Sequence, residues 1–288
     1  MGTDNGILIY NYRTDRYEQP ATDFPTDVRT MALQGDTLWI GALNGLYTYQ
    51  LQNRKLSPLD TKRNGLPHNT IYSIIRTGDN QIYVGTYNGL CRYIASNGKF
   101  EKIPLPVNSS QSNLFVNSLL EDTGRQCIWI GTEGYLFQYF PSTGQMKQTE
   151  AFHNNSIKSL ALDGNGDLLA GTDNGLYVYH NDVTPLQHII HDSRNIQSLT
   201  NNIIWNIFAD QEHNIWLGTD YGISLSRYNS ALQFIPISQI TGTGDGNQFY
   251  SLFRDSKGFY WFGGTNGLIR FTTIAKSKNS RPKNKMCH

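Results

Sequence analysis

The chain has 288 residues and a formal net charge of +1, with 16% charged and 12% aromatic residues. Because phosphate binding requires a concentrated basic face, this balance argues against nucleic acid as the main partner. No run approaches the ~18 apolar residues of a transmembrane helix, so we expect no membrane contact by this region itself.

One short pattern recurs along the chain and predicts its organisation. Copies include "LWIGALNGLYTY", "IYVGTYNGLCRY" and "IWLGTDYGISLS", each with a glycine before a polar turn. These anchor glycines are Gly2, Gly41, Gly85, Gly131, Gly171, Gly218 and Gly263. Their spacing of 39–47 residues is typical of propellers and solenoid arrays.

The first unit begins inside the pattern, because Gly2 is already an anchor glycine. It predicts only the end of one strand, followed by strands over residues 7–12 and 17–19. The N-terminus also lacks a signal-peptide pattern. We therefore expect a truncated first repeat, cut from a longer protein.

The unit around Gly85 illustrates the complete repeat. Its apolar runs predict strands over residues 71–76, 81–85, 90–94 and 100–103, separated by turns rich in asparagine and glycine. Four antiparallel strands in each repeat predict a blade of a β-propeller. The predicted fold class is thus all-β, a propeller over residues 1–272 that is most consistent with seven blades, one of them incomplete.

The C-terminal segment differs from the repeats. After Phe271 the sequence predicts no fourth strand. Residues 273–288 form a basic tail without acidic residues, which we expect to be disordered. Its cationic residues are Lys276, Lys278, Arg281, Lys283 and Lys285.

Large side chains share one register two residues before the anchor glycines, and four of them are tryptophans. They are Trp39, Tyr83, Trp129, Leu169, Trp216 and Trp261. A flat ring at one fixed point of each repeat predicts packing between neighbouring blades. The glycine that follows predicts a close backbone approach or a bulge.

Two segments carry a resemblance to a known family. "SLTNNIIWNIFADQEHNIWLGTDYGISL" (198–225) and "LPHNTIYSIIRTGDNQIYVGTYNGLCRY" (66–93) are similar to the two-component-regulator propeller repeat. The resemblance implies the periplasmic sensor region of a hybrid two-component system of Bacteroidetes-type bacteria. It also implies non-catalytic binding of an oligosaccharide or other small ligand, next to a neighbouring propeller or protomer. No kinase segment accompanies the repeats in this chain.

One position, about thirteen residues before each anchor glycine, holds a different kind of residue in different repeats. The position holds Arg29, Tyr72, Asn117, Lys158, Trp205 and Tyr250, after a shift of one residue in two repeats. These polar, cationic or aromatic residues stand between apolar or small neighbours, and we predict a ring of them near the mouth of the channel. Rings, amides and cations suit sugars and their acidic substituents. The alternative is that they only fill or solvate the channel.

Other candidate sites are weaker. Glu133 and Tyr221 are loop-face candidates in the turns after the anchor glycines, where turn chemistry alone is the alternative. His188 and His191 have HxxH spacing but do not lie on a predicted helix, so we predict no metal site, and no cofactor is predicted.

Two other functions remain open. One is a carbohydrate-active propeller enzyme, a lyase or a glycoside hydrolase, although paired carboxylates cannot be assigned on the channel face. The other is a protein-interaction propeller without a small ligand.

Overall fold

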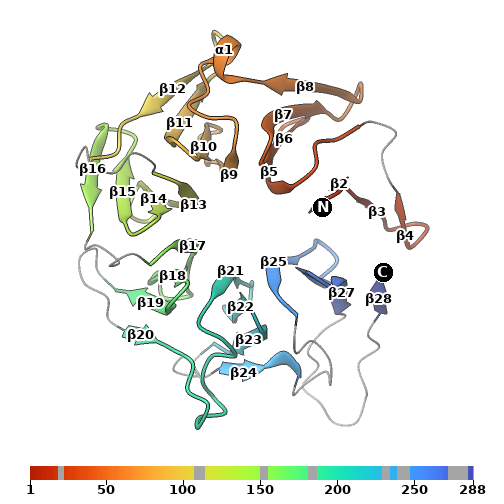
Figure 1. Cartoon of the computed structure of the whole chain (residues 1–288), viewed down its shortest axis with the longest axis vertical. Coiled ribbons are helices and arrows are strands. Elements are labelled where there is room, and N and C mark those ends of the chain that lie inside the picture. The colour runs from red at the N-terminus through yellow and green to blue at the C-terminus, as the bar shows by residue number, and fades with distance from the viewer. Residues whose placement is uncertain are drawn as a thin grey trace. The chain divides into compact units, whose positions relative to one another are not determined.

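The computed structural model describes residues 1–18, 23–106, 114–149, 155–180, 187–228, 234–238, 247–271 and 285–287. The chain divides into two compact units, of which the first comprises residues 1–133 and 137–148 and the second residues 134–136 and 149–288. Both are built from consecutive antiparallel sheets (Figure 1). In the part of the chain described, no helix is long and apolar enough to cross a membrane.

The first unit holds three four-stranded sheets, each a meander in chain order. The sheets are β5 (Val28–Gln34), β6 (Thr37–Ala42), β7 (Gly45–Gln50) and β8 (Lys55–Leu59); β9 (Ile71–Arg76), β10 (Ile82–Thr86), β11 (Gly89–Ile94) and β12 (Lys99–Ile103); and β13 (Val116–Asp122), β14 (Cys127–Thr132), β15 (Leu136–Phe140) and β16 (Gln145–Gln148). A short helix, α1 (Thr61–Asn64), follows β8. Its N-cap, Asp60, accepts a hydrogen bond from the Arg63 amide.

The second unit repeats the same plan in three further sheets. They are β17 (Ile157–Leu162), β18 (Leu168–Thr172), β19 (Gly175–Tyr179) and β20 (Gln187–Ile189); β21 (Ile204–Ala209), β22 (Ile215–Thr219), β23 (Gly222–Ser226) and β24 (Phe234–Pro236); and β25 (Phe249–Arg254), β26 (Tyr260–Gly264), β27 (Gly267–Phe271) and β28 (Lys285–Cys287).

Within each unit, the first strand of one sheet packs beside the first strand of the next. In the first unit β9 lies between β5 and β13, and in the second unit β21 lies between β17 and β25 (Figure 1). Apolar side chains of both neighbours fill the space between the sheets. Four-stranded meanders that pack in this way are propeller blades, so the predicted all-β propeller with antiparallel blades is confirmed.

The described residues form six four-stranded blades rather than seven. The first repeat instead forms two two-stranded sheets, β1 (Gly2–Thr3) with β2 (Gly6–Ile7) and β3 (Ile9–Asn11) with β4 (Arg16–Glu18). The strands that the sequence predicted around Gly85 are confirmed, with ends that differ by at most one residue.

The last blade contains a strand that the sequence did not predict. β28 pairs antiparallel with β27, so the expectation of no fourth strand after Phe271 is wrong. The reason is that residues 285–287 pair across a long separation in the chain, and such pairing depends on tertiary contact more than on local pattern. Residues 272–284 and 288 lie outside the described residues, and the boundary at residue 272 stays a prediction.

A threonine fixes the turn after the anchor glycine. Thr86 Oγ1 donates to the Gly89 carbonyl oxygen at 2.9 Å and accepts from the Asn88 amide at 3.1 Å. The glycine that ends the turn has φ +95°, a value that side-chain-bearing residues rarely adopt. The same bonds recur at Thr3, Thr172 and Thr219. The recurring motif therefore specifies a hairpin, and the turn that starts at Thr3 follows the same pattern.

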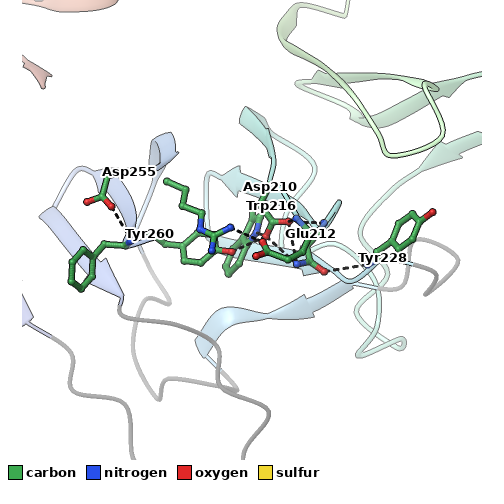
Figure 2. A network of polar contacts seen from close by, with 9 residues as sticks. Asp210, Glu212, Trp216, Tyr228, Asp255 and Tyr260 are labelled. Atoms are coloured by element: carbon green, nitrogen blue, oxygen red, sulfur yellow. Dashed lines mark hydrogen bonds and ion pairs between the residues drawn. The ribbon is translucent and has the colours of Figure 1, made fainter. Parts of the chain in front are cut away.

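Three of the four tryptophans in register are held by carboxylates of their own blades, and Trp39 donates to the Gln34 side-chain oxygen. Trp216 Nε1 donates to Asp210 Oδ2 at 2.9 Å (Figure 2). Trp261 Nε1 donates to Asp255 Oδ2 at 2.7 Å. Trp129 donates to Asp122 in the same way. Each aspartate lies at or next to the hairpin between the first two strands of its blade. Buried indoles normally require such a partner, so the packing role predicted for these rings includes a hydrogen bond.

Candidate functional site

The six residues predicted from the first strands share one structural position. In each four-stranded sheet, the pairing of the first two strands shifts at one residue of the first strand. The six residues skipped in this way are Arg29, Tyr72, Asn117, Lys158, Trp205 and Tyr250. A β-bulge redirects the side chain of the skipped residue, and bulges are enriched next to functional sites. We call these six the bulge residues; their role in ligand binding stays a prediction.

Three of the bulge residues meet in the second unit. Lys158 Nζ lies 4.4 Å from the centroid of the Trp205 ring, which is a cation–π contact. Trp205 and Tyr250 meet edge to face, with 5.2 Å between ring centroids. Tyr250 is 39% exposed, and Trp205 is half-buried. The sequence therefore predicted all three members of this contact.

Two polar residues complete the group, which we call the Trp205 cluster: Lys158, Trp205, Tyr250, Asp220 and Gln248. Asp220 Oδ1 accepts from Trp205 Nε1 at 2.9 Å and from Gln248 Nε2 at 2.7 Å. Gln248 Oε1 in turn accepts from the Tyr250 hydroxyl. The cluster thus combines two aromatic rings, a cation and a carboxylate that is already bonded within the protein.

The other three bulge residues lie in the first unit, and two of them, Tyr72 and Asn117, interact with Glu133. Asn117 Nδ2 donates to Glu133 Oε1 at 2.9 Å. Burial raises the pKa of Tyr72, and the nearby Tyr87 and Glu133 raise it further, whereas Arg29 opposes them. The Tyr72 hydroxyl therefore stays protonated at neutral pH and is able to donate. These residues offer amide, phenol and guanidinium groups on one unit.

The sequence prediction missed part of this arrangement, because in most turns after the anchor glycine it selected the second residue instead of the first. The first turn residue, which follows the threonine position, contacts the bulge residue: Asp220 contacts Trp205, and Glu133 contacts Asn117. Tyr221, the predicted loop-face candidate, is 53% exposed. A usable signal was present, because the first turn residue varies among repeats as the bulge residue does.

The histidines with HxxH spacing face different partners. His188 stacks on Tyr177 with 4.1 Å between ring centroids, and its Nε2 contacts the Asn174 carbonyl oxygen. The His191 ring contacts the Leu199 carbonyl oxygen through Nδ1. Across the described ranges, no group of three or more His, Cys, Asp or Glu residues could hold a metal ion.

Comparison with protein families matches three segments of the chain, residues 65–88, 198–221 and 243–266. All three match the family described as "Two component regulator propeller". This chain carries two-component regulator propeller repeats. The resemblance predicted from residues 66–93 and 198–225 is confirmed. The matched segments contain three bulge residues, Tyr72, Trp205 and Tyr250.

Proteins similar to this chain include two crystallised extracellular domains and a histidine kinase. Two crystal structures show the extracellular domain of one Bacteroides thetaiotaomicron protein, described as a putative hybrid two-component system in one case and a putative one-component system in the other. They are 88% and 92% identical to this chain, cover 99% and 95% of it, and both have a TM-score of 0.77. Histidine kinase P4 of Formosa agariphila is 28% identical over 97% of the chain.

The chain spans only part of these relatives. It covers 37–38% of the two crystallised domains and 22% of the histidine kinase. A more distant structure, an inactive variant of virginiamycin B lyase from Staphylococcus aureus, is 14% identical, with a TM-score of 0.69 over 93% of this propeller and 87% of the lyase. This likeness concerns the fold alone.

Proposed function

We propose that this propeller is part of the periplasmic sensor region of a hybrid two-component system, and that it binds an oligosaccharide without cleaving it. The observation that carries this proposal is the 88–92% identity to the extracellular domain of a putative hybrid two-component or one-component system, over nearly the whole chain. Bound ligand would change how the propeller contacts a neighbouring propeller or protomer, and a kinase elsewhere in the protein would respond.

The chemistry of the Trp205 cluster supports a sugar as the ligand. The apolar face of a pyranose packs on an aromatic ring, and its hydroxyls accept hydrogen bonds from cationic groups. Trp205 and Tyr250 supply rings that are partly open to solvent. Lys158 supplies an ammonium group that forms no ion pair among the described residues. We propose that the bulge residues of each unit contact ligand, with Trp205 of the second unit as the main contact.

The carboxylates beside the bulge residues favour binding over catalysis. A glycosidase requires one carboxyl group that is free to donate a proton and a second that attacks or activates water. Asp220 and Glu133 instead accept hydrogen bonds from bulge residues, and Asp173 accepts one from the Ser156 amide. The enzyme alternative therefore finds little support in these groups.

We also propose that the two small N-terminal sheets belong to a seventh, incomplete blade. A Cβ on Gly2 would lie 2.5 Å from Val28 Cγ1, just as one on Gly41 would lie 2.5 Å from Ile71 Cγ2. The N-terminal turn thus packs on β5 as a complete blade packs on the next blade. Gly2 therefore takes the place of an anchor glycine.

A thermal-shift screen of the full chain against plant and host oligosaccharides tests the proposed function. A ligand that binds only the folded state raises the melting temperature. We expect stabilisation by an intact oligosaccharide, with no product detected by chromatography after long incubation. Cleavage of the stabilising sugar would support the enzyme instead. The absence of any stabilising glycan, together with a protein partner recovered by pull-down, would support an interaction platform.

A further inference from the structure

The contacts of the Trp205 cluster form a closed loop. Trp205 contacts Tyr250 edge to face, Tyr250 donates to Gln248, Gln248 donates to Asp220, and Asp220 accepts from Trp205. The side chains come from three places: the first strand of one blade, the turn of the same blade, and the start of the next blade. One carboxylate oxygen, Asp220 Oδ1, receives two of the hydrogen bonds.

A hydrogen bond from a bulge residue to the first turn residue recurs in another blade. In the first unit the bulge residue Asn117 donates to Glu133, which occupies the turn position that Asp220 occupies in its own blade. The two hydrogen bonds have the same length of 2.9 Å. A contact that recurs between equivalent positions with different side chains indicates a role for the first turn residue beyond its local turn.

We propose that Asp220 is a positioning residue, which holds Trp205 directly and Tyr250 through Gln248 as a preformed aromatic platform. The inference rests on the proposed function, because the platform matters only if a ligand stacks on it. Ordering a mobile side chain during binding costs affinity, and a ring that is held in place beforehand avoids this cost. The indole N–H bond also fixes which face of Trp205 lies under Lys158.

The first test needs no ligand. With ¹⁵N-labelled tryptophan, the full chain gives one indole N–H signal for each of its five tryptophans. The variant Trp205→Phe assigns the Trp205 signal. We expect Asp220→Ala to shift this signal upfield and to speed its exchange with solvent, because the carboxylate acceptor is lost. Asp220→Asn retains an oxygen acceptor and should restore most of the position. An unchanged Trp205 signal in Asp220→Ala would overturn the inference.

Asp173→Ala provides the matched control. Asp173 occupies the equivalent turn position of the preceding blade, but its carboxylate accepts from the Ser156 backbone instead of a bulge side chain. We expect no change in the Trp205 signal of this variant. A shift as large as that of Asp220→Ala would mean that any altered turn disturbs the ring, which contradicts a specific positioning role.

The second test uses the oligosaccharide panel of the thermal-shift screen. We expect Asp220→Ala to weaken binding of each stabilising sugar about tenfold, the cost of ordering one or two side chains on binding. Asp220→Asn should lie between this variant and the unaltered chain. Unchanged affinity in Asp220→Ala, despite a shifted indole signal, would refute the positioning role in binding. If no sugar stabilises the unaltered chain, the proposed function fails, while the indole experiment still decides whether Asp220 holds the ring.

Discussion

At the scale of single residues, Asp210 links two neighbouring blades of the second unit. It accepts from Trp216 of its own blade at 2.9 Å and from the Tyr260 hydroxyl of the next blade at 2.8 Å (Figure 2). Burial favours the neutral acid, but the hydrogen bonds that it accepts outweigh burial. The pKa of Asp210 is therefore held below its ordinary value of 3.8.

The lowered pKa predicts an acid-dependent contribution to stability. A carboxyl group with a depressed folded-state pKa stabilises the fold above its unfolded-state pKa and loses this effect as the pH falls through the folded-state value. We expect Asp210→Asn to lower the melting temperature at pH 7, and the difference from the unaltered chain to shrink below pH 3.8. Thermal unfolding at pH 7 and pH 3 measures both. A difference that is equal at the two pH values would contradict the role of the charge.

A pair of serines in the two units tests a second contact at this scale. Ser73 Oγ donates to the Val116 carbonyl oxygen of the next blade at 3.1 Å. Ser159 occupies the equivalent position, but its buried Oγ has no hydrogen-bond partner among the described residues. We expect Ser73→Ala to lower the free energy of unfolding by about 1–2 kcal/mol. Ser159→Ala should leave it unchanged or raise it, because an unpaired polar atom is removed. Urea titration of both variants checks this, and equal losses would be the contrary result.

Some residues could be predicted from the sequence and others could not. The tryptophan register and all six bulge residues followed from their spacing to the anchor glycines, because aligning the repeats reveals which positions are equivalent. Asp220 was not selected for the site, although its turn position varies among repeats, because spacing alone does not encode the side-chain contacts by which it joins three segments. Gln248, at the end of the same chain of contacts, was missed for the same reason.

At the scale of elements, the anchor glycine sets how closely one blade approaches the next. A Cβ on Gly85 would lie 2.2 Å from Ser73 Oγ and 2.6 Å from the Val116 carbonyl oxygen. Such distances are too short for any side chain, and the Val116 atom belongs to the backbone of the next blade. The close approach predicted from the sequence is thus confirmed at this position.

This crowding predicts a difference between two glycines of the same blade. We expect Gly85→Ala to lower the free energy of unfolding by about 1–3 kcal/mol through overpacking. Gly78 lies in the hairpin between β9 and β10, where the nearest neighbour of an added Cβ would be Glu121 Oε1 at 3.6 Å. Gly78→Ala is therefore the matched control and should change stability little. If the two variants lost equal stability in urea titration, close packing between blades would not explain why glycine occupies position 85.

The strands themselves were largely predictable, because alternating apolar runs and asparagine–glycine turns carry local signals. The helix α1 and the strand β28 were not predicted. A helix of four residues is too short to show a periodic pattern in the sequence. The pairing of β28 with β27 joins segments on either side of residues 272–284, so no local pattern marks it.

At the scale of the whole molecule, the repeats specify a propeller, and the variable bulge residues determine which side chains are available to contact a ligand. The anchor glycine and the turn recur in each blade, whereas the residue at the bulge position changes from blade to blade. One backbone position accordingly holds five residue types of different size and charge in six blades: Arg29, Tyr72, Asn117, Lys158, Trp205 and Tyr250. A scaffold that repeats while one position varies is suited to recognising an asymmetric ligand such as an oligosaccharide.

The most direct test of this account is the effect of Trp205→Ala on oligosaccharide binding by the full chain. Phe253→Ala is the matched control, because Phe253 is 53% exposed near the other end of β25 from Tyr250. Circular dichroism and the melting temperature without ligand establish that both variants fold. We predict that Trp205→Ala abolishes the thermal shift caused by the stabilising sugar, whereas Phe253→Ala retains it. Binding that is unchanged in a folded Trp205→Ala variant would contradict the assignment of Trp205 as the main ligand contact.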